Sequence, residues 1–191
     1  MTAPRPDRRE LVARILRDRG DALVVTGLGT PTWDVAAAGD HDANLYLWGA
    51  MGQAVPTALG LALAQPGRRV LCVTGDGEML MGLGALAVVA SQPQASLGVL
   101  VLDDERFSET GDQAGLTELG TDLEAIARGA GIPRTMTLAA MDGARDATAM
   151  LLGADGPAFV LAKVAQSGAR PVHPERHGAA ISDRVRRHLG L

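Results

Sequence analysis

The amino-acid sequence predicts an α/β fold, a parallel sheet with helices on both faces, formed as a single domain over residues 1–191. Continuously apolar runs at 69–74 and 97–102 are typical of strands that are buried on both faces. These runs alternate along the chain with stretches of helical periodicity, which is the order that produces a parallel sheet. The length of 191 residues, with 47% hydrophobic and 21% charged residues, suits one compact domain.

The expected helices carry apolar residues at helical spacing, and some have clear end signals. The first spans 7–19, where Asp7 can cap the start and Gly20 can end the helix. A small-residue helix follows at 53–64, with Pro56 tolerated because it lies near the first turn. Further helices are expected at 78–90, 123–130, 144–152 and 178–189.

The expected strands are short, and three of them lead into glycine-rich or acidic loops. These loops are Gly27-Leu28-Gly29, Gly75-Asp76-Gly77 and the polar segment 103–117. Ligands of parallel α/β sheets bind at the carboxyl ends of the strands, so the three loops predict the position of a site. The strands are expected at 22–25, 45–48, 69–74, 97–102, 135–138 and 158–164.

Composition excludes several classes of function. The formal net charge is −4 without a long basic run, so no nucleic-acid partner is expected. No apolar segment reaches membrane-spanning length and 1–9 does not resemble a signal peptide, so no membrane association is expected. Cys72, the single cysteine, lies in an apolar run and is expected to be buried, which fits a reducing cytoplasm. The four histidines lack metal-ligand spacing and are expected at the surface or at helix caps.

The motif Gly75-Asp76-Gly77 predicts a phosphate site that contains a cation. Backbone N–H groups at the start of the following helix attract a phosphate, whereas a neighbouring carboxylate repels it. Magnesium reconciles the two, because it takes hard oxygen ligands and bridges carboxylate to phosphate. Asp104 follows the next buried strand, after one helix and the return strand. An ordinary Asp-Gly turn and a solvated acidic loop are the alternatives.

The spacing of these two motifs resembles the fingerprint of the thiamine-diphosphate enzymes. The resemblance implies that Asp76, Asp104 and the backbone oxygen of Arg106 are the magnesium ligands. Two positions depart from the family pattern. Asp104 stands where the family has Asn, which adds negative charge beside the diphosphate, and Glu78 stands where Ser or Ala is common.

A second segment, Trp48–Ala54, is similar to the Gly-Ser-Met-Gly segment of thiamine decarboxylases. The resemblance implies that Met51 lies under the cofactor and holds its two rings in a bent V. The alternative is that Met51 fills the core, as most methionines do.

A third segment, Phe107–Gln113, resembles the aromatic-Gly-x-Thr-Gly-x-Gln loop of sulfopyruvate and phosphonopyruvate decarboxylases, with Thr26–Thr32 at the place of their first diphosphate loop. The resemblance implies a 2-oxoacid substrate, with Thr110 and Gln113 as candidate contacts. It assigns the cofactor contacts to Gly27, Gly29, Thr30, Gly49, Met51, Gly75, Asp76, Gly77, Glu78, Asp104, Arg106, Phe107 and Ser108.

The resemblance also implies a partner. In this family a glutamate from a pyrimidine-binding domain activates the cofactor, and that half is expected on another polypeptide, so no catalytic residue is assigned to this chain. The expected protein is the beta-type subunit of a two-chain 2-oxoacid decarboxylase that uses thiamine diphosphate and magnesium, with a homodimer possible for the chain alone. Alternatives are a subunit of another thiamine-dependent lyase or ligase acting on a 2-oxoacid, or a non-catalytic cofactor-binding subunit. A Rossmann nucleotide-binding domain is also open, although Gly27-Leu28-Gly29 lacks the third glycine.

Overall fold

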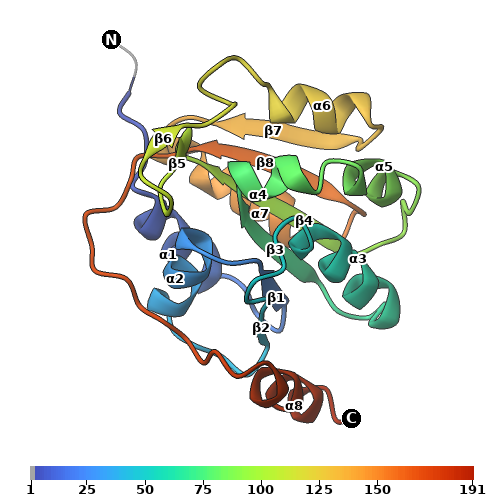
Figure 1. Cartoon of the computed structure of the whole chain (residues 1–191). Coiled ribbons are helices and arrows are strands. Elements are labelled where there is room, and N and C mark those ends of the chain that lie inside the picture. The colour runs from blue at the N-terminus through green and yellow to red at the C-terminus, as the bar shows by residue number, and fades with distance from the viewer. Residues whose placement is uncertain (1–2) are drawn as a thin grey trace.

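A six-stranded sheet, with all strands parallel, forms the centre of the protein. The computed structural model describes residues 3–191, and Figure 1 shows the sheet between two layers of helices. The strand order is β2-β1-β3-β4-β8-β7. The strands are β1 (Leu23–Thr26), β2 (Asn44–Tyr46), β3 (Val70–Gly75), β4 (Leu97–Asp103), β7 (Arg134–Leu138) and β8 (Ala158–Lys163).

Helices cover both faces of the sheet and bury two separate hydrophobic cores. One core, around Phe159, contains residues of α3, α5 and α6, and the other, around Leu71, contains residues of α1, α2 and α7. This arrangement confirms the predicted fold class, since the central strands are apolar on both sides. The helices are α1 (Arg8–Arg17), α2 (Thr30–Ala37), α3 (Ala54–Ala64), α4 (Asp76–Met81), α5 (Ala85–Ala90), α6 (Leu123–Gly129), α7 (Ala144–Leu152) and α8 (Gly178–His188), with a 3₁₀ turn η1 (Met141–Gly143) before α7.

Three local predictions differ from the structure. The helix expected over 78–90 is two helices, because a turn at Gly82 and Gly84 separates α4 from α5. Helix α2 was not expected; it begins directly after Gly29 and has Pro31 in its first turn. The polar segment 103–117 contains a small antiparallel hairpin of β5 (Arg106–Phe107) and β6 (Gln113–Ala114).

The strand order places a topological switch point between β1 and β3. From β1 the chain moves outward to β2, and it then returns to form β3 on the other side of β1. Connections that leave β1 and β3 therefore go to opposite faces, which opens a crevice at the carboxyl ends of these strands. Both glycine-rich loops of the sequence, 27–29 and 75–77, begin at this crevice.

The remaining predictions concern single residues and the membrane. Cys72 is fully buried, and burial raises the pKa of its thiol, so it is a core residue. His177 caps α8, since its Nδ1 accepts a hydrogen bond from Ala180 N (3.3 Å), and His41 Nδ1 accepts one from Ala43 N (3.0 Å). Within residues 3–191, no helix combines the length and the apolar character needed to span a bilayer.

Candidate cofactor and metal site

A cavity of about 330 Å³ lies at the carboxyl edge of the sheet, at the switch point. Four connections line it: the loop after β1 with the start of α2, the segment after β2, the β3–α4 turn, and the loop after β4. The volume is in the range of small-molecule sites. The lining residues are Leu28, Gly29, Thr30, Pro31, Met51, Gly75, Asp76, Gly77, Glu78, Met81, Leu102, Asp104, Arg106, Phe107, Ser108, Glu109 and Thr110.

Asp76 is a buried carboxylate at the first residue of α4, with only 4% of its surface exposed. Burial and, to a smaller extent, the neighbouring carboxylate of Asp103 together raise the pKa of Asp76 to about 7. The Thr117 hydroxyl lies 3.0 Å from Asp76 Oδ2 and 2.8 Å from Asp103 Oδ1. One hydroxyl proton serves only one of these oxygens at a time, so the negative charge around Asp76 is incompletely compensated.

Asp104 lies across the same cavity on the loop after β4, and its carboxylate is held in a fixed orientation. Asp104 Oδ1 accepts a hydrogen bond from Arg106 N (3.1 Å), and Oδ2 accepts one from Ser108 Oγ (2.8 Å). The guanidinium of Arg106 pairs instead with Glu118 (3.1 Å). No ion pair joins either Asp76 or Asp104 to any cation among residues 3–191.

Asp103 has a different role from its neighbour. Its carboxylate is fully buried, and Lys163 Nζ lies 2.7 Å from Asp103 Oδ2 and 2.8 Å from Glu105 Oε1. Asp103 and Lys163 are register partners on β4 and β8, so the sheet itself brings them together. Lys163 therefore pairs with Asp103 and positions the loop, whereas Asp76 and Asp104 have no such partner within residues 3–191.

Glu78 connects the loops that build the cavity. Burial raises the pKa of Glu78, and this rise is opposed by a hydrogen bond from the Thr74 hydroxyl (2.8 Å) and by backbone N–H groups of Ala54, Leu28 and Gly52. A Cβ on Gly27 would come within 1.9 Å of the Glu78 carboxylate, so a side chain at that position would displace this carboxylate. Glu78 thus lies against the first loop and forms part of the cavity wall.

Met51 lines the cavity from a segment that is held by close backbone contact. Its side chain is 46% exposed, so Met51 is not a core residue of this chain. The next residue, Gly52, has a φ of +78° and approaches α4 so closely that a Cβ on Gly82 would lie 2.2 Å from the Gly52 carbonyl oxygen. This contact fixes the position of the Met51 segment relative to Asp76 and Glu78 on α4.

Most of the predicted cofactor and substrate residues meet in this cavity, but three of them, two for the cofactor and one for the substrate, lie outside its lining. Gly27 contacts Glu78 behind the wall, and Gly49 lines an adjoining cavity of about 330 Å³. Gln113, predicted as a substrate contact together with Thr110, is exposed on β6 and donates a hydrogen bond to the Thr110 carbonyl (2.9 Å). Sequence reasoning did not identify Met81, Glu109 or Thr117. Met81 follows Glu78 by about one helical turn, so the sequence could have indicated that both residues lie on the face of α4 that lines the cavity.

The chemistry of the lining fits a cation bound to a phosphate group. Four acidic side chains line the cavity, Asp76, Glu78, Asp104 and Glu109, and none of them forms an ion pair within residues 3–191. The glycine turn beside them is tight, since a Cβ on Gly77 would lie 3.0 Å from the Phe107 ring. No group of three or more His, Cys, Asp or Glu side chains suited to a metal occurs within residues 3–191. A metal held by Asp76 and Asp104 would therefore complete its shell with backbone carbonyls and ligand oxygens, which suits a hard cation such as Mg²⁺.

Comparison with known proteins gives an independent result. The family described as "Thiamine pyrophosphate enzyme, C-terminal TPP binding domain" matches residues 36–162, which include the segments of Met51, Asp76 and Asp104. Phosphonopyruvate decarboxylase of Streptomyces viridochromogenes is 38% identical over 160 residues, 83% of this chain and 40% of that protein. Sulfopyruvate decarboxylase subunit beta of Methanothermobacter thermautotrophicus is 37% identical over 125 residues, 65% of this chain and 66% of that protein.

Another relative and the solved structures agree with this match. Sulfopyruvate decarboxylase subunit beta of Methanocaldococcus jannaschii is 31% identical over 69% of this chain and 70% of its own length. The thiamine diphosphate-dependent 4-hydroxybenzoylformate decarboxylase of Rhodococcus jostii superposes with a TM-score of 0.67, covering 88% of this chain and 34% of that chain at 22% identity. Benzoylformate decarboxylase of Polynucleobacter necessarius gives a TM-score of 0.71, covering 86% and 34% at 16% identity. These structures share the fold, and the chain belongs to the thiamine pyrophosphate enzyme family as a C-terminal-type TPP binding domain.

Proposed function

We propose that this chain is the thiamine diphosphate- and magnesium-binding subunit of a two-subunit 2-oxoacid decarboxylase. The observation that carries the proposal is the convergence of Asp76 and Asp104, without any ion-pair partner in the described chain, on one cavity at the switch point of the sheet. The family match and the names of the relatives support it. When bound, thiamine diphosphate supplies the electron sink for loss of CO₂ from a 2-oxoacid.

The metal is assigned to Asp76, Asp104 and the backbone carbonyl of Arg106. The first two are oriented carboxylates, because Thr117 holds Asp76 while Ser108 and the Arg106 N–H hold Asp104. A divalent cation would oppose both causes of the raised pKa of Asp76, its burial and the repulsion by neighbouring carboxylates. Asp in place of Asn at 104 adds a negative charge, which strengthens the attraction for the cation and weakens that for the diphosphate.

The diphosphate and the thiazolium ring are assigned to the remaining lining. Backbone N–H groups at Gly29-Thr30 and at Gly77-Glu78 open α2 and α4 and are donors for phosphate oxygens. Gly77 leaves room for the Phe107 ring, which closes this side of the cavity. Met51 is the apolar residue placed to support the bent cofactor, and its exposure indicates a surface that a ligand covers.

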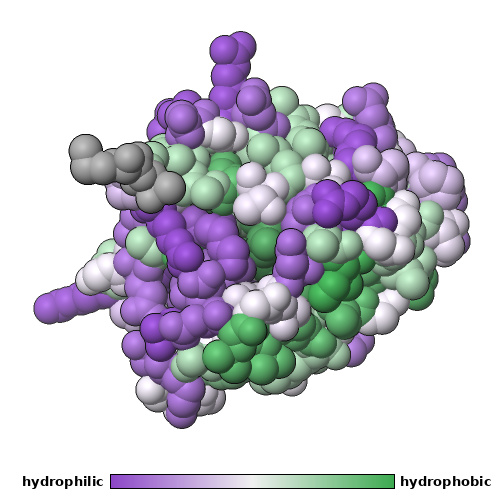
Figure 2. Space-filling model, turned by 90° about the horizontal axis from the view of Figure 1, so that it is seen from above, coloured by the Kyte–Doolittle hydropathy of each residue, from purple (hydrophilic) through white to green (hydrophobic). Residues whose placement is uncertain are grey.

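A pyrimidine-binding domain on a partner subunit would supply the glutamate that activates the cofactor. The beta-subunit names of two relatives support this arrangement. Figure 2 shows a hydrophobic area on the molecule seen from above, and the large exposed apolar side chains include Met51, Leu63, Met81 and Val88. Exposed apolar surface of this kind marks interaction sites. A homodimer could cover it in the absence of the partner, and a cytoplasmic location fits the single buried cysteine.

The substrate is assigned to the 2-oxoacids, with the far end of the molecule recognised largely outside this chain. Arg106 is the only basic residue in the cavity lining, and its guanidinium pairs with Glu118. Glu109 adds a carboxylate to the lining. A second anion on the substrate, such as a sulfonate or phosphonate, would therefore need a cation from the partner subunit, with Thr110 as the hydroxyl donor on this side.

Purification of the tagged native protein with its partner tests the proposal. The complex should release CO₂ from at least one of pyruvate, sulfopyruvate and phosphonopyruvate, and only with both thiamine diphosphate and Mg²⁺ present. The isolated chain should show no turnover above background, because the proposal assigns the activating glutamate to the partner subunit. A coupled assay of CO₂ release, repeated with EDTA, measures the turnover of the complex and of the isolated chain and its dependence on Mg²⁺.

Two outcomes would count against parts of this proposal. Robust turnover by the isolated chain would contradict the two-subunit arrangement. A complex that binds thiamine diphosphate but releases CO₂ from none of the three acids would contradict the decarboxylase assignment. It would not contradict the assignment of the cofactor site. Preference for pyruvate over both dianionic acids would exclude a partner cation that recognises the second anion.

A further inference from the structure

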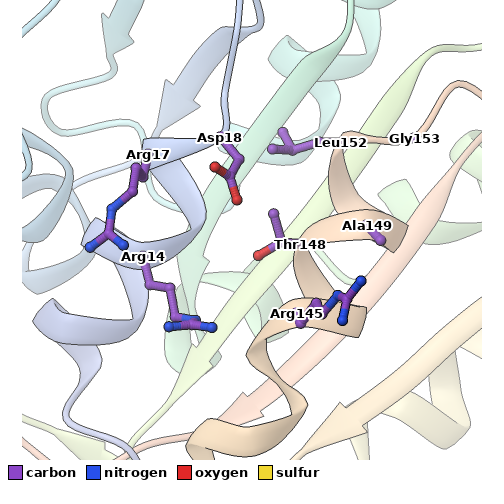
Figure 3. A pocket seen from close by; sticks show the side chains of 8 residues that line it. All are labelled: Arg14, Arg17, Asp18, Arg145, Thr148, Ala149, Leu152 and Gly153. Atoms are coloured by element: carbon purple, nitrogen blue, oxygen red, sulfur yellow. The ribbon is translucent and has the colours of Figure 1, made fainter.

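A second cavity, of about 510 Å³, lies between α1 and α7 and shares no lining residue with the cofactor cavity. Asp18 and Gly153, the C-caps of the two helices, both line it. Each of these helices leads into the first residue of a strand, α1 into β1 and α7 into β8, so their C-termini lie toward the amino edge of the sheet, away from the cofactor. Figure 3 shows the lining residues: Arg14, Arg17, Asp18, Arg145, Thr148, Ala149, Leu152 and Gly153.

The groove concentrates positive charge on an acidic protein. Arg14, Arg17 and Arg145 are exposed, and none forms an ion pair with a residue in the part of the chain from 3 to 191. Asp18 is the only carboxylate in the lining, whereas the whole chain has a formal charge of −4. Three guanidinium groups beside one carboxylate form a local anion-attracting field.

Helix electrostatics explains two of these arginines but not the third. Arg14 and Arg17 lie in the last turn of α1, where a cation is favoured by the helix dipole. Arg145 is the second residue of α7, at the positive end of that helix, where the dipole disfavours a cation. Its position opposite Arg14 therefore needs another reason, and a bound anion between the two helices provides one.

The other lining groups define what kind of anion fits. Arginine binds phosphate oxygens through paired N–H donors. The Thr148 hydroxyl already donates to the Ala144 carbonyl (2.7 Å), and Ala149 and Leu152 are apolar, so the groove between the charged groups offers a hydrophobic surface. In Figure 3 the guanidinium of Arg14 extends from α1 toward α7, the guanidinium of Arg145 extends along α7 away from Arg14, and Asp18 lies near Leu152.

We propose that this groove is a second ligand site, which binds a small molecule bearing two or more phosphate groups. Arg14 and Arg145 contact the phosphates from the two helices, and Arg17 adds to the attraction. Asp18 accepts hydrogen bonds from a hydroxyl or amino group if the ligand carries one. A nucleotide and free pyrophosphate share the required chemistry, and the experiment distinguishes them.

NMR titration of the ¹⁵N-labelled full chain tests the site directly, because amide shifts locate the bound probe. ATP, pyrophosphate and adenosine are each added at about 150 mM salt, where diffuse attraction is screened within about 8 Å. We expect ATP and pyrophosphate to cause saturable shifts in residues 14–18 and 145–153, and adenosine to cause none. Tighter binding of ATP would identify the nucleotide, and equal binding would identify the diphosphate group.

Paired variants provide the control. Arg14→Gln with Arg145→Gln should weaken binding at least about tenfold, because two charge-assisted contacts are lost. Arg186→Gln with Arg187→Gln, two exposed positions near the end of α8, removes the same charge elsewhere and should leave the affinity unchanged. Shifts confined to the cofactor loops, equal weakening by both variant pairs, or shifts from adenosine alone would overturn the proposal.

Discussion

Replacement of Asp76 by Asn is expected to abolish magnesium-dependent binding of thiamine diphosphate by this chain in complex with its partner. Asn preserves the shape of the side chain and can still accept the Thr117 hydrogen bond (3.0 Å in the native protein), so the loop should keep its structure. The change removes the carboxylate assigned to the metal, and we expect the affinity to fall roughly 100-fold or more. Calorimetric titration with thiamine diphosphate, with Mg²⁺ and with EDTA, measures this loss.

The same change should stabilise the metal-free protein. The pKa of Asp76 in the folded chain is raised to about 7 from 3.8, so its ionised form is disfavoured by folding. The resulting cost develops as the pH rises through this interval and is complete above pH 7, where it is on the order of 4 kcal/mol. Asp76→Asn should therefore raise the melting temperature of the metal-free chain at pH 8 and have little effect near pH 4.

Asp104→Asn is the matched control for this prediction. It restores the residue typical of the family and retains an oxygen ligand, so cofactor binding should persist or improve. Undiminished magnesium-dependent affinity in Asp76→Asn, or complete loss in Asp104→Asn, would show that the metal is bound elsewhere. A lower melting temperature of metal-free Asp76→Asn at pH 8 would contradict the electrostatic account of this buried carboxylate.

Gly82→Ala is expected to destabilise the protein and to displace the Met51 segment. The added Cβ would lie 2.2 Å from the Gly52 carbonyl oxygen, and both groups belong to the backbone. Gly52, with a φ of +78°, has little freedom to move away. We expect a loss of about 1–3 kcal/mol in the free energy of unfolding, measured by urea denaturation, and weaker binding of thiamine diphosphate.

Gly84→Ala, two residues further along the chain, is the control that distinguishes the steric effect of a Cβ at Gly82 from the effect of replacing any glycine by alanine. Gly84 has a helical φ of −60°, and a Cβ there meets no atom within 4 Å. Alanine at this position should be neutral, or stabilising by about 0.4–1 kcal/mol through the entropy of the unfolded chain. Similar stability of the two variants would mean that the contact between Gly52 and Gly82 does not fix the cofactor loops.

The contrast between these two glycines also shows which features of the fold could not be predicted from the sequence. A helical pattern over 78–90 predicted one helix, whereas the chain breaks between α4 and α5 at Gly82, where the close contact with Gly52 leaves no room for a Cβ. Helix α2 was missed because it is eight residues long and follows a glycine loop. The hairpin of β5 and β6 consists of two-residue strands, which are too short to show a period.

The candidate site was more predictable than its surroundings. Asp76 and Asp104 each follow an apolar strand, and the carboxyl ends of neighbouring parallel strands lie at the same edge of the sheet. The proximity of the two residues could therefore be derived from the order of strands and loops along the sequence. The different roles of Asp103 and Asp104 could not be derived in this way. They depend on Lys163, which is sixty residues away in the sequence but lies beside Asp103 in the sheet. Thr117 likewise reaches Asp76 only because the β5–β6 hairpin turns the chain back.

A crystal structure of the complex grown with thiamine diphosphate and Mn²⁺ in place of Mg²⁺ tests the central claim most directly. Manganese takes the same hard oxygen ligands and gives an anomalous signal that locates it without reference to the protein coordinates. The account predicts an anomalous peak bound by the carboxylates of Asp76 and Asp104, the carbonyl oxygen of Arg106 and the diphosphate. Thiamine diphosphate bound in the cavity with the manganese peak elsewhere, or bound without manganese, would contradict it.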